Sequence, residues 1–145
     1  MNYTIYFNAK KLNSNDADAI AEYAKRLSAY CKINWYCKPA KSIKALPPFR
    51  KPSKHTLYVP VRTGETTPSS EELAEQINQI NIQGISAVCF FIGYEDSTEQ
   101  NDTNSITIPV LSLSSMTLSP GLTGVVLYEQ LYRSYRILNG QPYHK

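Results

Sequence analysis

The sequence is poor in the residues and patterns that mark membrane, secreted and metal-binding proteins. Its 145 residues contain three cysteines and two histidines. No apolar run approaches the ~20 residues of a transmembrane helix, and the N-terminus lacks the basic and apolar regions of a secretory signal. Cys31, Cys37 and Cys89 show no CxxC spacing, and neither His55 nor His144 lies beside a cysteine pair. We therefore expect a cytoplasmic protein with buried, unpaired thiols, no membrane contact and no metal site.

Familiar catalytic signatures are also missing. The sequence has no P-loop, no GxGxxG and no HExxH, and two histidines leave no arguable Ser/His/Asp set. The adjacent acids Glu71-Glu72 and Glu95-Asp96 are typical of a helix N-terminus and of a solvated surface. An enzymatic function would therefore need another arrangement of residues.

The charges are divided between the two halves of the chain. Residues 1–62 hold twelve Lys/Arg and three Asp/Glu, a net charge of +9, whereas residues 63–145 hold three and nine, a net charge of −6. Between Tyr23 and Gly64 there are ten basic residues and no acid. This asymmetry suggests a polyanion facing the N-terminal half, and a basic stretch of this kind supplies salt-dependent affinity for RNA.

Hydrophobic periodicity and turn residues predict one α/β domain over residues 1–145. The run Ala87–Ile92 is apolar throughout, which is typical of a strand buried on both faces of a parallel sheet. The proline-rich, basic residues 38–55 are expected to form a loop. The expected strands cover residues 3–7, 33–37, 56–61, 87–92 and 105–113. The expected helices cover residues 15–31 after a cap at Asn13 or Ser14, the stretch between the capping-box residue Ser69 and Gly84, and the stretch from Leu122 to Asn139.

This order of elements predicts a mostly parallel sheet. Ligands of such sheets bind at the carboxyl ends of the strands. The loops that follow Val61, Ile92 and Leu113 are therefore the expected place of a functional site.

The closing part of the sequence carries its most specific motifs. Residues 111–122 read LSLSSMTLSPGL, residues 128–135 read YEQLYRSY, and the last six residues read GQPYHK. This order resembles the Ser-Leu-Ser-x-x-Thr-Leu loop, the Glu-Gln-Leu-Tyr-Arg helix and the Pro-Tyr-His-Lys end of the RlmH family. These SPOUT methyltransferases modify pseudouridine in large-subunit ribosomal RNA. Upstream, EYAKRL at 22–27, SSEELA at 69–74 and FIG at 91–93 resemble the family's first two helices and a strand end.

The resemblance implies both a fold and an activity. The fold is a SPOUT-type α/β sandwich with a C-terminal trefoil knot, in a homodimer that acts on ribosomal RNA or the ribosome. The activity is methyl transfer from S-adenosylmethionine to N3 of a pseudouridine in 23S ribosomal RNA. A strand-end glycine and a loop of small residues can bring backbone groups close to an adenine. The implied cofactor contacts are Leu57, Gly93, Leu113, Ser114, Ser115, Met116, Thr117 and Leu118.

The resemblance also implies four candidates for the work at the reacting nitrogen. His144 could take the N3 proton or hold the base edge with Tyr143 beside it, and Arg133 could hold a phosphate or ring oxygens. Glu129 is the fourth candidate, and its i,i+4 spacing to Arg133 equally fits a helix-supporting ion pair. Tyr143 and His144 equally fit a frayed terminus. The general base stays unassigned.

Three departures from the family bear on activity. Tyr94 stands where the family has a second glycine, and we expect it to narrow the cofactor entrance or to shift its loop. Pro120 and Gly124 stand where the family has His and Arg, so a basic pair is lost. Residues 38–55 form a shortened basic loop where the family usually has a helix. A non-catalytic or retargeted RNA-binding paralogue of the same fold is the alternative, and a fortuitous likeness of an unrelated α/β protein is a third hypothesis.

The dimer also has a motivation in the residues themselves. The last helix carries Tyr128, Tyr132 and Tyr135, and tyrosine is enriched in interface cores. If this helix packs onto the sheet of its own chain, its Val125 and Val126 face accounts for that contact. Some of the tyrosines then remain to contact a partner.

Overall fold

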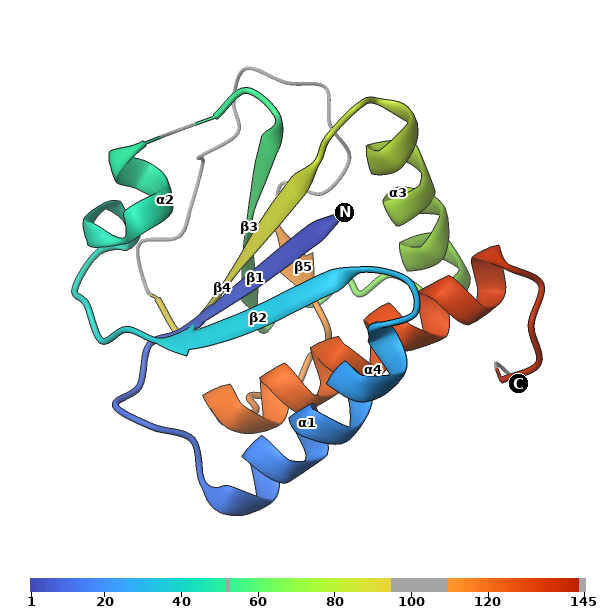
Figure 1. Cartoon of the computed structure of the whole chain (residues 1–145). Coiled ribbons are helices and arrows are strands. Elements are labelled where there is room, and N and C mark those ends of the chain that lie inside the picture. The colour runs from blue at the N-terminus through green and yellow to red at the C-terminus, as the bar shows by residue number, and fades with distance from the viewer. Residues whose placement is uncertain (52, 95–109, 144–145) are drawn as a thin grey trace.

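The computed structural model describes residues 1–51, 53–94 and 110–143 of the chain. Five strands form one sheet in the order β2-β1-β4-β3-β5 (Figure 1). They are β1 (Asn2–Phe7), β2 (Lys32–Cys37), β3 (Thr56–Arg62), β4 (Ala87–Ile92) and β5 (Leu111–Ser112). All four pairings between neighbours are parallel, which confirms the predicted α/β sandwich with its parallel sheet.

The two faces of the sheet are covered unequally. Ile5 and Phe90 point into a core on the side of the long helices. Their neighbours Tyr6 and Phe91 point into a smaller cluster on the opposite face, which we call the open face because no long helix covers it among the described residues (Figure 1). Figure 1 shows the three long helices together on one side and α2 apart from them. The long helices are α1 (Ser14–Leu27), α3 (Ser70–Ile82) and α4 (Pro120–Leu138), and the short ones are η1 (Ile43–Ala45) and α2 (Pro47–Arg50).

Side-chain caps fix where the long helices begin. The Asn13 side chain accepts a hydrogen bond from the Asp16 backbone N–H at 2.8 Å, so the predicted cap of α1 is confirmed. Ser69 and Glu72 form the predicted capping box at α3. Ser119 caps α4, and Pro120 occupies its first turn because the missing N–H is not needed there.

Three expected boundaries were wrong. Residues 38–55 contain η1 and α2 rather than only a loop, because Ile43 and Leu46 bury themselves on the open face of the sheet. The first helix ends at Leu27 instead of residue 31, and α4 begins at Pro120. Of the expected strand 105–113, the described part shows Leu111–Ser112 as strand, and residues 105–109 lie outside the described residues. The knot depends on the path of residues 95–109, so it stays a prediction.

The tyrosines of α4 pack largely within their own chain. Tyr128 and Tyr135 are buried, and the Tyr3 and Tyr135 hydroxyls lie 2.9 Å apart in a hydrogen bond. Tyr132 is half-buried and contacts the rings of Tyr23 and Tyr30. The core of the chain therefore uses residues that the sequence suggested for a partner, and the dimer itself stays a prediction.

The basic residues between Tyr23 and Gly64 separate into two groups. Arg26 lies on α1, where its guanidinium is 5.6 Å from the Tyr23 ring centre and 5.9 Å from that of Tyr132. Lys38, Lys41 and Lys44 are exposed in the segment that covers the opposite face of the sheet. Among the residues that the structure describes, no helix has the length and apolar character needed to cross a membrane.

Candidate active site

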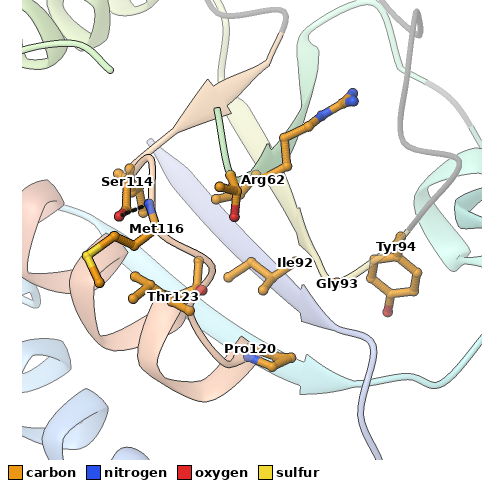
Figure 2. A pocket seen from close by; sticks show the side chains of 12 residues that line it. Arg62, Ile92, Gly93, Tyr94, Ser114, Met116, Pro120 and Thr123 are labelled. Atoms are coloured by element: carbon orange, nitrogen blue, oxygen red, sulfur yellow. Dashed lines mark hydrogen bonds between the residues drawn. The ribbon is translucent and has the colours of Figure 1, made fainter. Parts of the chain in front are cut away.

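A cavity of about 260 Å³ opens at the carboxyl ends of β3 and β4. The loop after β5 and the first turn of α4 close it on the other side (Figure 2). These are the three strand-end loops at which the sequence predicted a site. The lining residues are Val61, Arg62, Thr63, Ile92, Gly93, Tyr94, Leu113, Ser114, Met116, Leu118, Pro120 and Thr123.

Gly93 forms the wall at the end of β4 in a conformation that favours glycine. Its φ is +88°, and a Cβ there would meet the Asn8 Cβ at 3.4 Å and the Pro120 Cγ at 3.6 Å. The Asn8 side chain donates to the Gly93 carbonyl oxygen at 3.0 Å and accepts from the Ala40 backbone N–H at 3.1 Å. Asn8 therefore connects the cavity wall to the start of the basic residues 38–55.

Tyr94 borders the cavity without filling it. Its ring packs edge-on against Phe91 in the cluster on the open face, and its hydroxyl donates to the Lys38 carbonyl oxygen at 2.6 Å. Burial raises the pKa of the Tyr94 phenol, so it remains a neutral donor at physiological pH. Figure 2 shows the ring apart from Ser114 and Met116. The departure from glycine thus places the bulk of Tyr94 outside the cavity.

The loop after β5 is held by hydrogen bonds of Ser114. The Met116 backbone N–H donates to Ser114 Oγ at 2.8 Å, and the Gly64 N–H donates to the Ser114 carbonyl oxygen at 3.1 Å. The Ser112 hydroxyl also donates to the Ser114 carbonyl oxygen, at 3.2 Å. The loop therefore presents its small residues in a defined arrangement to the cavity.

The structure brings five of the eight implied cofactor contacts together at the cavity: Gly93, Leu113, Ser114, Met116 and Leu118. Ser115 and Thr117 are exposed beside it, and Leu57 is 1% exposed in the core on the side of the long helices. Thr63, Pro120 and Thr123 were not singled out as contacts, although the strand-end rule covers Thr63 because it follows Val61.

A second polar cluster lies on the C-terminal half of α4. Arg133 Nε donates to Glu129 Oε1 at 3.0 Å, in an ion pair whose side chains are about one fifth exposed. The Arg133 guanidinium lies 5.0 Å from the centre of the Tyr143 ring, and that ring meets Tyr132 edge-on at 4.9 Å. Three of the four implied catalytic residues are thus in contact, and the fourth, His144, lies outside the described residues.

The end of the described chain is docked rather than frayed. Arg136 donates to the Pro142 carbonyl oxygen at 3.0 Å and to the Gln141 side chain at 3.2 Å. Burial and a hydrogen bond to Tyr23 raise the pKa of the Tyr143 phenol. Tyr143 is therefore neutral at physiological pH and suited to donating a hydrogen bond rather than to removing a proton.

The cavity and this cluster lie at opposite ends of α4. Arg133 lies thirteen positions after Pro120, which at a rise of ~1.5 Å per residue is about 20 Å along the helix. Within one chain, Arg133 and Tyr143 are therefore too far from the cavity to act on a group bound there. In the described ranges, no group of three or more His, Cys, Asp or Glu side chains is placed to hold a metal ion.

Comparison with known proteins shows the family to which the chain belongs. The model of the family described as predicted SPOUT methyltransferase matches residues 1–144, and the chain belongs to this family. It is 35% identical over 150 residues to ribosomal RNA large subunit methyltransferase H 1 of Thermoanaerobacter sp., with all of both chains covered. It is 34% identical over 160 residues, again with full coverage, to ribosomal RNA large subunit methyltransferase H of Shouchella clausii. The protein is thus a methyltransferase of the SPOUT class.

Proposed function

We propose that the chain transfers a methyl group from S-adenosylmethionine to N3 of a pseudouridine in large-subunit ribosomal RNA. The observation that carries this proposal is the cavity at the strand ends, which gathers Gly93, Ser114 and Met116 where the resemblance put the cofactor loop. The names of its relatives support ribosomal RNA as the substrate. Each active site would combine the cavity of one copy with the Arg133 and Tyr143 cluster of another.

The lining of the cavity suits the chemistry of the cofactor. The volume of the cavity is close to the lower limit, about 300 Å³, of small-molecule sites. Ile92, Leu113 and Leu118 supply apolar cover for a purine, and Thr63 and Thr123 supply hydroxyl groups. The absence of a Cβ at Gly93 keeps open the wall that faces Pro120. Gly93, Leu113, Ser114, Met116 and Leu118 would hold the bound group.

The residues of the second cluster suit the requirements of the target base. S-adenosylmethionine, when bound, supplies a methyl group whose bonding electrons leave with its sulfur. N3 of pseudouridine carries a proton that must be accepted before or as N3 attacks, and His144 is the candidate acceptor. Arg133, held by Glu129, can stabilise negative charge on the ring oxygens, and Tyr143 can donate a hydrogen bond to them.

The distance along α4 is the main support for a shared site. A second copy would bring the cluster of one α4 to the cavity of the other, as a two-fold interface does for both sites at once. Two of the five exposed large apolar side chains of the described ranges lie at this end of the molecule: Met116 lines the cavity, and Val110 lines a second hollow that shares Arg62 and Thr63 with it. Such residues are suited to burial against a second copy.

Calorimetry with S-adenosylmethionine tests the cavity. Thr123→Trp would fill the space and abolish binding, because Thr123 lines the cavity. Leu122→Trp is the matched control, since Leu122 is the next residue of α4, does not line the cavity and is 43% exposed. If the unchanged protein does not bind millimolar cofactor, the proposal fails and the non-catalytic RNA-binding alternative takes its place.

Mixed dimers test whether the site is shared. A cavity-blocked chain (Thr123→Trp) and a cluster-deleted chain (Arg133→Ala) would each be inactive alone. Coexpressed, they would recover about a quarter of the wild-type rate, because about half of the dimers are mixed and each has one intact site. The assay uses ribosomes or ribosomal RNA with labelled cofactor, followed by mapping of the label. No recovery would place the site within one chain.

A further inference from the structure

The open face of the sheet carries an exposed aromatic side chain amid basic residues. Tyr36 on β2 is 46% exposed and is the aromatic member among the exposed large apolar side chains of the described residues. Its ring lies against Tyr6 at 5.8 Å between centres. Tyr6 in turn is packed with Ile43 and Leu46 of the segment that covers part of this face. One side of the Tyr36 ring is thus packed against the protein, and the ring is held in place by this contact.

The strand pattern places the alternate side chains of β2 and β1 side by side on this face. Lys32, Asn34 and Tyr36 alternate with residues that pack toward the long helices, so they share the open face. They lie opposite Asn2, Thr4 and Tyr6 of β1 in the parallel register. We define the platform by these six residues. Because β2 is at the edge of the sheet, no further strand of the described residues lies beside it.

The charged residues of β2 and of residues 38–55, which follow it, are all basic. Lys38, Lys41 and Lys44 are exposed along the carboxyl end of the platform, and no acidic residue occurs between Tyr23 and Gly64. The two ion pairs found within the described ranges are Lys25–Glu22 and Arg133–Glu129, so neither uses these lysines. A ligand for this surface therefore needs negative charge together with flat apolar groups.

We propose that the platform binds a single-stranded segment of RNA, with one base stacked on Tyr36 and the adjoining phosphates on Lys38, Lys41 and Lys44. Base stacking on an exposed tyrosine and phosphate contacts from lysines are how proteins hold single strands without reading sequence. Asn34, exposed two residues before Tyr36 on the same face, offers an amide to a base edge. This inference rests on the proposed function, which supplies RNA as the polyanion.

The platform is connected to the cavity through its carboxyl end. The Lys38 carbonyl oxygen accepts from Tyr94, and the Ala40 N–H donates to Asn8, which also holds Gly93. A single-stranded RNA bound beside Lys38 would therefore pass the edge of the cavity wall. This position suits an anchor for the RNA that flanks the target nucleotide.

Fluorescence anisotropy with a labelled single-stranded polyadenylate of about 12 nucleotides, a length within known site sizes, tests the proposal. Tyr36→Ala should weaken binding about tenfold, whereas Tyr36→Phe should retain the wild-type affinity because it keeps the stacking ring. Lys38→Gln and Lys41→Gln should each lower the slope of log K against log salt by about 0.7. Duplex RNA of equal length should not distinguish Tyr36→Ala from wild type.

Several results would overturn the platform. They are wild-type affinity for the single strand in Tyr36→Ala, equal weakening for single strand and duplex, or a change of oligomeric state in Tyr36→Ala by light scattering. The last would make this face an interface between copies. If the unchanged protein neither binds S-adenosylmethionine nor methylates RNA, the proposed function fails, yet the difference between Tyr36→Ala and Tyr36→Phe would still establish the platform.

Discussion

At its first turns α4 presents glycines to its neighbours, whereas at its last turns it presents tyrosines and arginines. A Cβ at Gly124 would overlap the Phe7 ring, so the helix backbone lies directly on β1 there. At the other end, Tyr135 reaches Tyr3 through its hydroxyl and Arg136 reaches the tail through hydrogen bonds. The N-terminal end of α4 therefore leaves no room for a side chain at Gly124. The C-terminal end is held by polar contacts, which single substitutions can remove one by one.

The largest effect is expected from Gly124→Arg, which introduces the residue that the family has at this position. The side chain must displace Phe7 or the helix, and overpacking of this kind costs about 3 kcal/mol of unfolding free energy. Chemical denaturation measures the loss. Leu122→Arg is the control on the same helix, because Leu122 is exposed and should tolerate the change. Equal stability of both variants would show that the close packing at Gly124 is wrong.

At the opposite end, Arg133→Ala should reduce methyl transfer about 100-fold without changing cofactor affinity, because the lost donor acts on the target base. Arg133→Lys keeps the charge but not the planar fork that pairs with Glu129, so it should recover only part of the rate. Single-turnover transfer and calorimetry separate the two effects. A parallel loss of cofactor affinity would place Arg133 at the cavity instead of at the base.

Local patterns predicted the place of the cavity well. The apolar run of β4, the capping box at Ser69 and the rule that ligands lie at strand ends depend on neighbours in sequence and on sheet topology. They located the cavity without any knowledge of side-chain packing. The two short helices at residues 43–50 were missed because their formation depends on Ile43 and Leu46 finding the open face of the sheet.

Long-range geometry was not available from the sequence. Tyr94 was expected to narrow the cofactor entrance or to shift its loop. It borders the cavity, and the sequence did not reveal that its ring packs against Phe91 in the buried cluster on the open face. Gly93 lies beside Pro120 at the start of α4, which the sequence does not reveal, and the distance from there to Arg133 then follows from the length of the helix. Tyr128 and Tyr135 belong to the core because α4 packs with these residues toward the sheet, which their residue type alone does not reveal.

The hydroxyl pair of Tyr3 and Tyr135 should make the C-terminal end of α4 sensitive to alkali. Burial raises the pKa of Tyr135 from 10.0 to about 12 and that of Tyr3 further still. The unfolded chain therefore loses these protons first, so stability is complete below about pH 10 and falls as pH rises toward about 12. Tyr135→Phe should cost about 1 kcal/mol at neutral pH, because it leaves the Tyr3 hydroxyl without this partner, and should make the alkaline decline shallower. Denaturant titrations at several pH values measure the loss at neutral pH and the alkaline decline. An unchanged decline in Tyr135→Phe would show that the Tyr3–Tyr135 pair does not cause it.

The smallest change in stability, and the finest test of the contrast between the two ends, is expected from Arg136→Gln. The guanidinium holds the chain at Gln141 and Pro142, next to Tyr143, but contributes little to the core, so unfolding free energy should change by less than about 0.5 kcal/mol. Turnover should nevertheless fall about tenfold with little change in cofactor affinity, because Tyr143 and the residues after it lose their position. Arg26→Gln is the matched control, since Arg26 also contacts the Tyr132 ring but lies on α1. If both variants reduce turnover equally, the effect belongs to the aromatic packing they share, and Arg136 has no separate role in positioning the tail.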